Sequence, residues 1–297
     1  MSSDIFGLSS KAPQAKVIYI PVPWEHTTSY GKGTAKGPKA ILKASDQVDL
    51  DHPELGSFYE AGLHMLPIPT SCGAKIDSEL SCNDYVYENS QKWLTQDKLI
   101  AIVGGDHSSP FGALQAIAEK HKQFGILHID AHADTRKAYQ GFTWSHASIM
   151  RNVIEKIPEV STLVQVGIRD FCQEETDFLK QHHNQIKMHT DFELMRARFD
   201  GITWKQQTER IIQNLPSQVW ISFDIDGLNP ALCPTTGTPV PGGLSFHEAY
   251  FMISSLVGAG KEIIGFDLCE VGSAEWDGNV GARMLYHMTG WMLESLR

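Results

Sequence analysis

Long apolar runs are missing from this sequence of 297 residues, and no stretch approaches the roughly 20 consecutive apolar residues that a membrane-spanning helix needs. Residues 1–14 are polar and small, with no basic segment leading into an apolar one, so a secretion signal is not predicted. Internal repeats, low-complexity tracts and linkers are absent as well. These absences predict a cytoplasmic protein that does not contact a membrane.

Cysteine and positive charge are both scarce. The five cysteines, an odd number, have no C-x-x-C spacing, which argues against a disulfide framework and a zinc ribbon. Lys and Arg number 25 against 35 Asp and Glu, so the formal net charge is -10 and no basic run could neutralise phosphates. We therefore expect no nucleic-acid partner. The acidity would help to attract a cationic substrate, although ordinary solubility is the simpler explanation.

The chain does contain a regular alternation of β-rich runs and helical patterns, which predicts parallel strands joined by crossover helices. Helix starts are marked by Pro38, by Ser109 with Pro110, and by the capping box of Ser245 and Glu248. The length fits one domain, 1–297, with residues 1–14 as a flexible or surface segment. The nearly all-apolar runs are typical of strands covered on both faces, and strands are predicted at residues 16–20, 98–103, 124–129, 162–167, 218–223 and 262–268.

Acidic residues and histidines gather in three short clusters, each directly after an apolar run. The carboxyl ends of parallel strands meet at one edge of a sheet, so residues distant in sequence can converge there. In extended chain, residues i, i+2 and i+4 point to one side, and the small residues between them leave room for close backbone approach. One Asp-x-Asp segment is common in turns, but three at equivalent strand ends predict a site. The clusters are Gly104-Gly105-Asp106-His107, Asp130-Ala131-His132-Ala133-Asp134 and Asp224-Ile225-Asp226-Gly227.

Carboxylates and imidazoles are the ligand types of this predicted site, which contains no thiolate. Such an oxygen-rich set suits Mn²⁺ or another fairly hard ion better than a structural Zn²⁺. We expect two Mn²⁺ ions, with Co²⁺, Ni²⁺ or Fe²⁺ as alternatives. Two such ions lower the pKa of a shared water enough to make it a nucleophile near neutral pH, so the residues predict hydrolysis at an electrophilic carbon or phosphorus. The six candidate ligands are His107, Asp130, His132, Asp134, Asp224 and Asp226.

These motifs resemble those of the ureohydrolase family, which includes arginase, agmatinase and guanidinobutyrase. The resemblance runs from about Val17 nearly to the C-terminus. It implies a three-layer α/β fold with a central, mostly parallel sheet flanked by helices, a di-manganese centre, release of urea from a small cationic guanidino substrate, and homo-oligomers that are trimers or hexamers. The strings that carry it are TSYGKGTAKGPKAI from Thr28, GGDHS at Gly104, IDAHAD at Ile129, SFDIDGLNP at Ser222, TGTPVPGGLS at Thr236 and GFDLCEV at Gly265.

The same resemblance implies a role for each site residue. His146 matches the histidine that shuttles a proton to the leaving amine, and an ordinary pKa of about 6.5 suits a histidine to this task. Glu270 matches the glutamate that pairs with the substrate guanidinium, a planar cation that carboxylates bind well. Asp106 and Asp267 are candidates for acids that orient a metal-bound histidine. One metal would be held by His107, Asp130, Asp134 and Asp224, and the other by Asp130, His132, Asp224 and Asp226.

Two segments depart from the arginase pattern. The sequence Trp144-Ser145-His146-Ala147 stands where arginases have Asn-x-His-Gly, and Cys172 stands where they have an aspartate. Those arginase residues read the α-carboxylate and α-amino groups, so their replacement favours agmatine, which would give putrescine for polyamine biosynthesis and urea. Arginine and guanidinobutyrate are the alternative substrates. Residues 24–30 could line the pocket mouth or pack at a subunit contact.

Functions of other classes stay open at this point. A dinuclear phosphoesterase usually brings Arg or Lys to the phosphoryl group, whereas the clusters contain neither, and Glu270 would repel an anion. A non-catalytic metal-binding scaffold of the same fold is opposed by the presence of all six candidate ligands. The sequence thus favours a metal-dependent amidinohydrolase.

Overall fold

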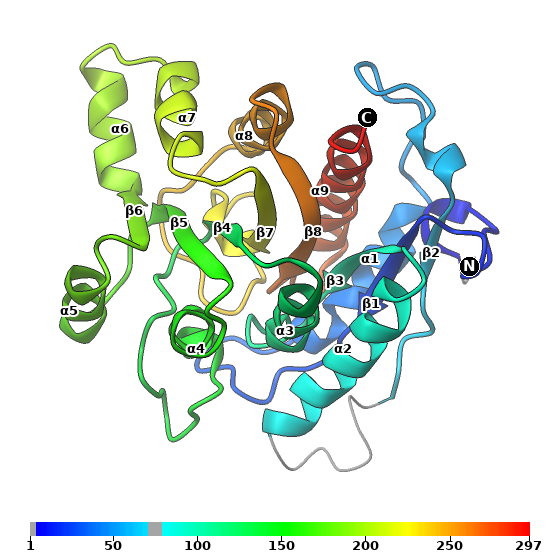
Figure 1. Cartoon of the computed structure of the whole chain (residues 1–297), viewed down its shortest axis with the longest axis horizontal. Coiled ribbons are helices and arrows are strands. Elements are labelled where there is room, and N and C mark those ends of the chain that lie inside the picture. The colour runs from blue at the N-terminus through cyan, green and yellow to red at the C-terminus, as the bar shows by residue number, and fades with distance from the viewer. Residues whose placement is uncertain (1–3, 71–78) are drawn as a thin grey trace.

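The computed structural model describes residues 4–70 and 79–297 and places a parallel sheet at its centre (Figure 1). This sheet has 8 strands in the order β2-β1-β3-β8-β7-β4-β5-β6, and every neighbouring pair is parallel. The bounds are β1 Val17–Pro21, β2 Leu63–Met65, β3 Leu99–Val103, β4 Phe124–Ile129, β5 Val160–Ile168, β6 Ile186–Thr190, β7 Gln218–Asp224 and β8 Glu262–Cys269. The predicted α/β class is confirmed.

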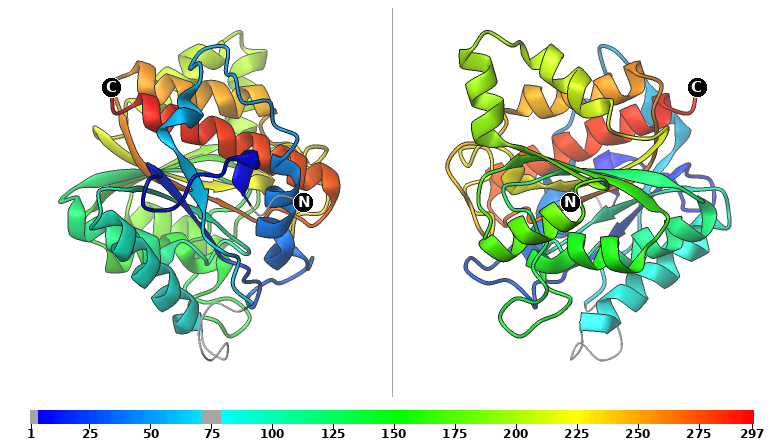
Figure 2. Two further views of the ribbon diagram at one scale, coloured as in Figure 1. Left: turned by 90° about the vertical axis from the view of Figure 1, so that its right-hand side faces the viewer. Right: turned by 60° about the vertical axis from the view of Figure 1, so that its left-hand side comes forward.

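Helices cover both faces of the sheet, as Figure 2 shows. They enclose two separate apolar cores. Strand β1 illustrates why, since Val17 and Tyr19 belong to one core and Ile18 and Ile20 to the other. One core is closed by α1 Gly37–Ser45, α6 Asp191–Phe199, α7 Trp204–Ile212, α8 Phe246–Gly258 and α9 Glu275–Glu294. The other is closed by α2 Glu79–Leu94, α3 Phe111–Lys120, α4 Ile149–Lys156 and α5 Gln173–Gln181. The three predicted layers are therefore present.

All six predicted strands exist, within one or two residues of the expected bounds. The sequence missed β2 and β6, which form the two edges of the sheet. Strand β2 is only 3 residues long, and most of β6 is half-buried, so neither has the apolar run that marks the central strands. The helix starts predicted at Pro38 and at Ser245 with Glu248 are confirmed in α1 and α8.

The N-terminal segment corrects one expectation. Residues 1–14 were expected to be flexible or at the surface, but Ile5 and Phe6 are buried. The Phe6 ring packs edge-on against Tyr286 of α9, with ring centroids 4.9 Å apart. Residues 1–3 lie outside the described residues. Burial of two large apolar side chains stabilises this segment against the core, which its polar composition concealed.

The four strands that carry the predicted clusters and Glu270 are neighbours. They are β3, β8, β7 and β4, consecutive at the middle of the sheet. Their carboxyl ends therefore open on one crevice, as expected for ligand sites of parallel α/β sheets. No helix in the two described ranges is both long and apolar enough to cross a membrane.

Candidate metal centre

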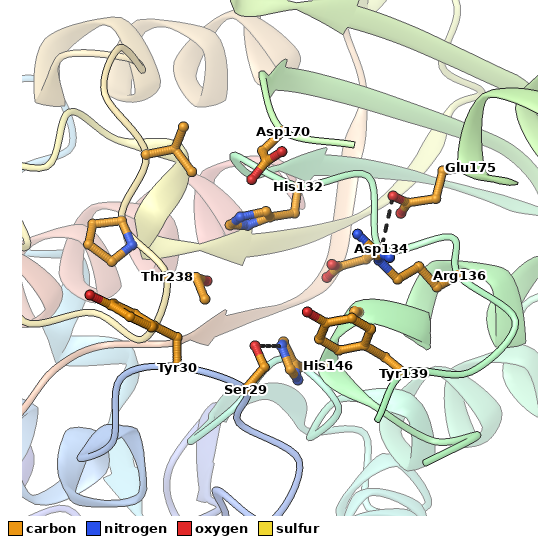
Figure 3. A pocket seen from close by; sticks show the side chains of 13 residues that line it. Ser29, Tyr30, His132, Asp134, Arg136, Tyr139, His146, Asp170, Glu175 and Thr238 are labelled. Atoms are coloured by element: carbon orange, nitrogen blue, oxygen red, sulfur yellow. Dashed lines mark hydrogen bonds and ion pairs between the residues drawn. The ribbon is translucent and has the colours of Figure 1, made fainter. Parts of the chain in front are cut away.

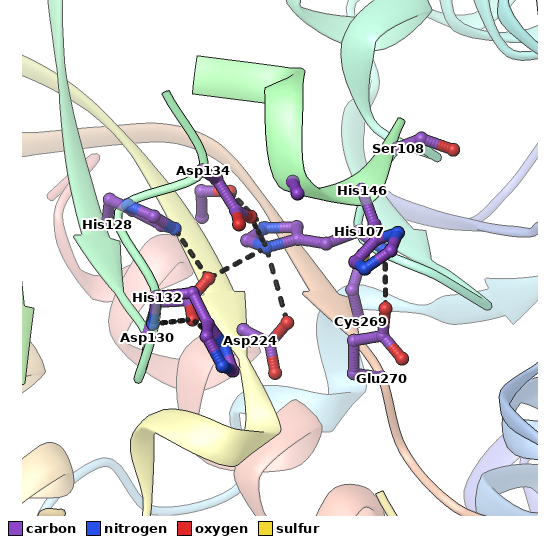
Figure 4. Close-up of polar contacts among 12 residues, drawn as sticks. His107, Ser108, His128, Asp130, His132, Asp134, His146, Asp224, Cys269 and Glu270 are labelled. Carbon is purple, nitrogen blue, oxygen red and sulfur yellow. Dashed lines mark hydrogen bonds and ion pairs between the residues drawn. The ribbon is translucent and has the colours of Figure 1, made fainter. Parts of the chain in front are cut away.

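The imidazole of His107, in the loop after β3, is surrounded by carboxylates from two other strand ends (Figure 4). Its Nδ1 lies 3.0 Å from Asp130 Oδ2, 3.2 Å from Asp134 Oδ2 and 3.3 Å from the Oδ2 of a third acid, Asp224. All four side chains are nearly or fully buried. Residues that lie far apart in the sequence thus converge on one point.

A second group lies beside the first. His132 Nδ1 is 3.1 Å from Asp226 Oδ2 and 3.5 Å from Asp130 Oδ1. Asp130 therefore directs one carboxylate oxygen toward His107 and the other toward His132. This position between the two groups fits the bridging role that the family resemblance implies for Asp130.

The backbone differs from the extended chain that the sequence pattern suggested. Asp134 has a φ of 54°, in the left-handed region that residues other than glycine rarely adopt. Asp226 lies in a 3-10 turn after β7, and its N–H donates to Asp224 Oδ1 over 2.8 Å. Tight turns, rather than strand alternation, direct Asp134 and Asp226 into the site.

Two glycines are required by close backbone contacts. A Cβ on Gly105 would lie 1.8 Å from the Trp24 carbonyl oxygen, and a Cβ on Gly227 would lie 2.7 Å from the Asp130 nitrogen. Real Cβ atoms never approach so closely, so either substitution would displace a ligand-bearing loop. The glycines of the motifs hold the strand-end loops together, as their positions suggested.

The far side of the His107 ring is held by a buried polar chain. His107 Nε2 donates to Ser222 Oγ over 2.9 Å, and that hydroxyl donates to Asp267 Oδ1 over 3.1 Å. Asp267 is thus linked to His107 through a serine on β7, which is compatible with the predicted orienting role. Asp106 instead accepts from the N–H and hydroxyl of Thr27, at 3.1 and 3.0 Å.

The charged groups of the candidate metal centre shift the pKa values of several of its residues. Burial alone would lower the pKa of His107, but hydrogen bonds that its ring donates to Asp130, Asp134 and Asp224 raise it well above its ordinary value. Burial likewise opposes the charge on His132, yet the carboxylates of Asp226 and Asp130 raise its pKa well above the ordinary value. Burial and the neighbouring acids raise the pKa of Asp224. The centre is thus an anionic cluster that favours cations.

Glu270 follows β8 and is 3% exposed. Its Oε1 accepts the backbone N–H of His107 over 3.0 Å, whereas its Oε2 has no hydrogen-bond partner among the described residues. Burial, followed by the charges of Asp106 and Asp226, raises the pKa of Glu270 well above its usual range. Like Asp134, Glu270 has left-handed backbone, with a φ of 59°. A buried, unpaired carboxylate oxygen requires a cationic or donor partner.

His146 stands at the wall of the same crevice, in a 3-10 turn before α4. Its Nε2 lies 3.3 Å from Ser29 Oγ, and its Nδ1 lies 3.3 Å from Thr27 Oγ1. Because Thr27 is itself fixed by Asp106, residues 24–30 hold this histidine in place. The loop therefore has a role in the site that sequence reasoning left open.

The crevice opens to solvent through a pocket shown in Figure 3. Asp170 and Thr238 line it beside His132, and Arg136 lines it beside Asp134. The residues that complete it are Ser29, Tyr30, Tyr139, His146, Ala147, Glu175, Pro239 and Val240. Acidic, basic and aromatic groups thus share its wall.

A model of the Arginase family matches residues 15–289. The chain belongs to the arginase family. It is similar to N(1)-aminopropylagmatine ureohydrolase of Thermus thermophilus, with 33% identity over 282 residues that cover 93% of this chain and 90% of the relative. It is also similar to proclavaminate amidinohydrolase of Streptomyces clavuligerus, with 30% identity over 91% of this chain and 87% of the relative. Agmatinase of Bacillus cereus is 28% identical over 87% of this chain and 84% of that protein.

Solved structures agree with this assignment. Agmatine ureohydrolase of Thermoplasma volcanium has a TM-score of 0.84 and 22% identity, with 99% of this chain and 95% of that chain covered. Proclavaminate amidinohydrolase of Streptomyces clavuligerus has a TM-score of 0.85 and 25% identity, with coverage of 99% and 98%. The predicted family and the three-layer fold are confirmed, and this arginase-family chain is a metal-dependent amidinohydrolase that cleaves C–N bonds.

The donor set of this arginase-family site fits two divalent ions. Nitrogen and oxygen atoms of one group come from His107, His128, Asp130 and Asp134, and those of the other come from Asp130, His132 and Asp226. Within each group these atoms lie within 4.8 Å of one another. Carboxylate oxygens together with one or two imidazoles per group are the ligands of fairly hard divalent cations. The residues present therefore suit the binuclear centre of the family.

Sequence reasoning missed three polar residues of the site that lie inside strands. His128 and Gln165 occupy β4 and β5, and Ser222 occupies β7, all of them fully buried. A polar residue within an apolar run is commonly a satisfied core residue, so only the spacing of two between His128 and Asp130 could have drawn attention to it. The role of Cys172 was also left open by the sequence. This residue is the N-cap of α5, and its N–H donates to Glu175 Oε2.

Proposed function

We propose that this enzyme hydrolyses agmatine to putrescine and urea with two Mn²⁺ ions. The observation that carries the proposal is the buried carboxylate of Glu270, whose Oε2 is unpaired among the described residues. A guanidinium supplies the planar pair of N–H donors that such a carboxylate binds best. A phosphoryl substrate would be repelled there.

Each residue of the candidate site has a distinct task in the proposed hydrolysis. The six aspartates and histidines would hold two divalent ions, and these would supply an activated water as the nucleophile. Glu270 orients the guanidinium so that its carbon faces the metal ligands. His146, clamped between Thr27 and Ser29, protonates the amine nitrogen as the C–N bond breaks. The tight packing around Gly105 and Gly227 keeps the ligands in register.

The tail of the substrate would extend toward the pocket mouth. Asp170 lines that region, is exposed, and makes no side-chain hydrogen bond or ion pair in the described part of the chain. Glu175, the other acid there, is engaged by the N–H groups of Thr135 and Cys172. Asp170 is therefore the acid that is free to attract the terminal ammonium of agmatine.

Two other substrate types are favoured by specific observations. N(1)-aminopropylagmatine, the substrate that the name of the Thermus relative indicates, would extend a longer cationic tail past Tyr30, which is 83% exposed. A carboxylate-ended compound such as guanidinobutyrate or arginine would instead use Arg136, whose Nε lies 3.8 Å from Glu175 Oε2 and whose guanidinium stacks on Tyr139. The unpaired Asp170 favours the amines.

The test is urea release by the purified enzyme after reconstitution with Mn²⁺. The panel contains agmatine, N(1)-aminopropylagmatine, arginine, guanidinobutyrate and guanidine, and we expect the highest kcat/KM with agmatine. Parallel loading with Co²⁺, Ni²⁺ and Fe²⁺ identifies the preferred metal, and light scattering tests the predicted trimer or hexamer. Urea from none of the five compounds would refute the proposal, and bound metal without turnover would favour a scaffold.

A further inference from the structure

A histidine inside the sheet contacts the metal centre and has no role in the scheme above. His128 lies on β4, two residues before Asp130, and is fully buried. Its Nε2 lies 2.8 Å from Asp130 Oδ2, the oxygen that also faces His107 (Figure 4). His128 could therefore be a further metal ligand or a hydrogen-bond donor to a ligand, and its tautomer decides between these roles.

The neighbouring strand fixes that tautomer. Gln165 on β5 directs its amide nitrogen at two atoms, the Ala133 carbonyl oxygen at 2.7 Å and His128 Nδ1 at 3.0 Å. A reversed amide would place two oxygens 2.7 Å apart at Ala133, which is repulsive. The NH₂ group thus faces both atoms and uses one hydrogen for each.

It follows that His128 Nδ1 is the acceptor and carries no proton. The ring proton is then on Nε2, which lies 2.8 Å from Asp130 Oδ2. A nitrogen that bears a proton cannot bind a metal ion through the same lone pair. His128 is therefore a donor to the carboxylate of Asp130 and not a seventh ligand.

Both oxygens of Asp130 are consequently held from the protein side. Oδ2 accepts from His128, and Oδ1 accepts the backbone N–H of His132 over 2.6 Å. Each oxygen has a second lone pair. Oδ2 also lies 3.0 Å from His107 Nδ1, and Oδ1 lies 3.5 Å from His132 Nδ1. Gln165 also binds the backbone between His132 and Asp134, so a single amide links the ligand-bearing loop to the carboxylate that joins the two groups.

We propose that His128, with its tautomer fixed by Gln165, is a positioning residue that holds the Asp130 carboxylate in the orientation needed to bridge two metal ions. The proposal rests on the binuclear centre but not on the identity of the guanidino substrate. Loss of such an outer hydrogen bond weakens metal binding by about 10- to 100-fold in known metal sites. We expect a loss of that size in Mn²⁺ affinity when either His128 or Gln165 is replaced by an apolar residue.

The experiment compares His128→Leu, Gln165→Leu and His128→Gln with the wild-type enzyme. Mn²⁺ affinity is measured by calorimetric titration of the metal-free proteins, and the Tm of each metal-free protein is recorded. Glutamine at position 128 can place an amide N–H near the site of Nε2, so His128→Gln should recover most of the affinity that His128→Leu loses. His52→Leu and Gln207→Leu are matched controls, because both side chains are buried outside the described site.

The positioning role predicts weaker Mn²⁺ binding in both leucine variants, with a Tm decrease no larger than that of the controls. Wild-type affinity in both variants would overturn it. A measurement that needs no variant is ¹⁵N NMR of the histidine rings in the metal-free wild-type protein, where a proton on His128 Nδ1 would also overturn it. Because neither readout uses urea release, weaker metal binding in an enzyme that cleaves none of the guanidino compounds would support this inference while refuting the proposed function.

Discussion

The metal centre and the mouth of its pocket are built in opposite ways. The centre consists of buried side chains at the ends of four adjacent strands, and Asp130 within it is fully buried. The mouth consists of loop residues such as Arg136 and Tyr139, and Tyr30 there is 83% exposed. Buried strand ends tolerate few changes, whereas loops accept many. The residues that would carry out the reaction and those that would select the substrate therefore lie in separate parts of the molecule.

The largest effect should follow from breaking the centre at Asp130. The variant Asp130→Asn removes the charge between His107 and His132, so both metal ions should bind more weakly. Because metal ions supply several kcal/mol of transition-state stabilisation, we expect urea release to fall by about 10⁴-fold. Elemental analysis measures the bound metal, and unchanged metal content would contradict the bridging position. Asp97→Asn, an exposed acid outside the site, serves as the control.

A smaller loss is expected from His146→Asn. His146 contacts Thr27 and Ser29 and none of the candidate ligands, so metal content should not change. General acid catalysis contributes about 10² to 10⁴ in rate, and we expect kcat to fall by about a thousandfold. Normal turnover would remove His146 from the mechanism.

Glu270→Gln tests the guanidinium site between the centre and the mouth. The amide keeps the shape of the side chain but loses the charge, so kcat/KM should fall by about a hundredfold while metal content stays the same. Glu262→Gln, at the opposite end of β8, is the matched control. An equal loss in both variants would show that Glu270 acts through folding rather than through substrate binding.

A change in pH should affect the affinity for metal and the stability of the metal-free protein in opposite directions. The pKa values of His107 and His132 are raised because nearby carboxylates outweigh burial, which acts in the opposite direction. Each proton displaced by a metal ion should weaken binding about tenfold per pH unit of acidification. The contribution of these histidines to stability is complete below the unfolded-state pKa of about 6.5 and is lost as the pH rises through the higher folded-state values. Above about pH 6.5, titrations with metal should therefore show affinity that increases with pH. Unfolding of the metal-free protein in urea should show stability that decreases with pH.

The smallest effects should come from the mouth. Asp170→Asn should raise the KM for agmatine by about fivefold, the usual size for an exposed ion pair, and should leave kcat unchanged. Guanidinobutyrate hydrolysis should be unaffected or improved. Asp177→Asn on the exposed face of α5 is the control, and an identical change in the KM for agmatine in both variants would deny a separate role to the mouth. The variant Arg136→Gln should instead weaken the hydrolysis of guanidinobutyrate and leave that of agmatine unaffected or improved.

The sequence predicted that the candidate ligands converge, because these residues follow the strands. His107, Asp130 and Asp224 stand where an apolar run stops, and parallel topology forces such positions together. The six main strands were found for the same reason, since burial on both faces leaves an uninterrupted apolar pattern. Glu270 also follows an apolar run, whereas its role and the choice of His146 came from the family motifs alone.

Side-chain partners inside the sheet could not be predicted. His128 and Gln165 lie on adjacent strands, and their pairing depends on the register of β4 against β5, where His128 faces Gln165. The clamp on His146 depends on a loop 119 residues away, through Thr27. Edge strands β2 and β6 lack the doubly buried pattern, and so they escaped detection.

The left-handed backbone at Asp134 and Glu270 has an evolutionary consequence. A residue with a Cβ in that region costs about 1–2 kcal/mol relative to its preferred conformations, a cost that glycine avoids. Selection for thermal stability alone would therefore favour glycine at two positions where glycine would abolish the chemistry. If both carboxylates persist under selection for thermal stability, selection for activity must have retained them despite the cost in backbone conformation.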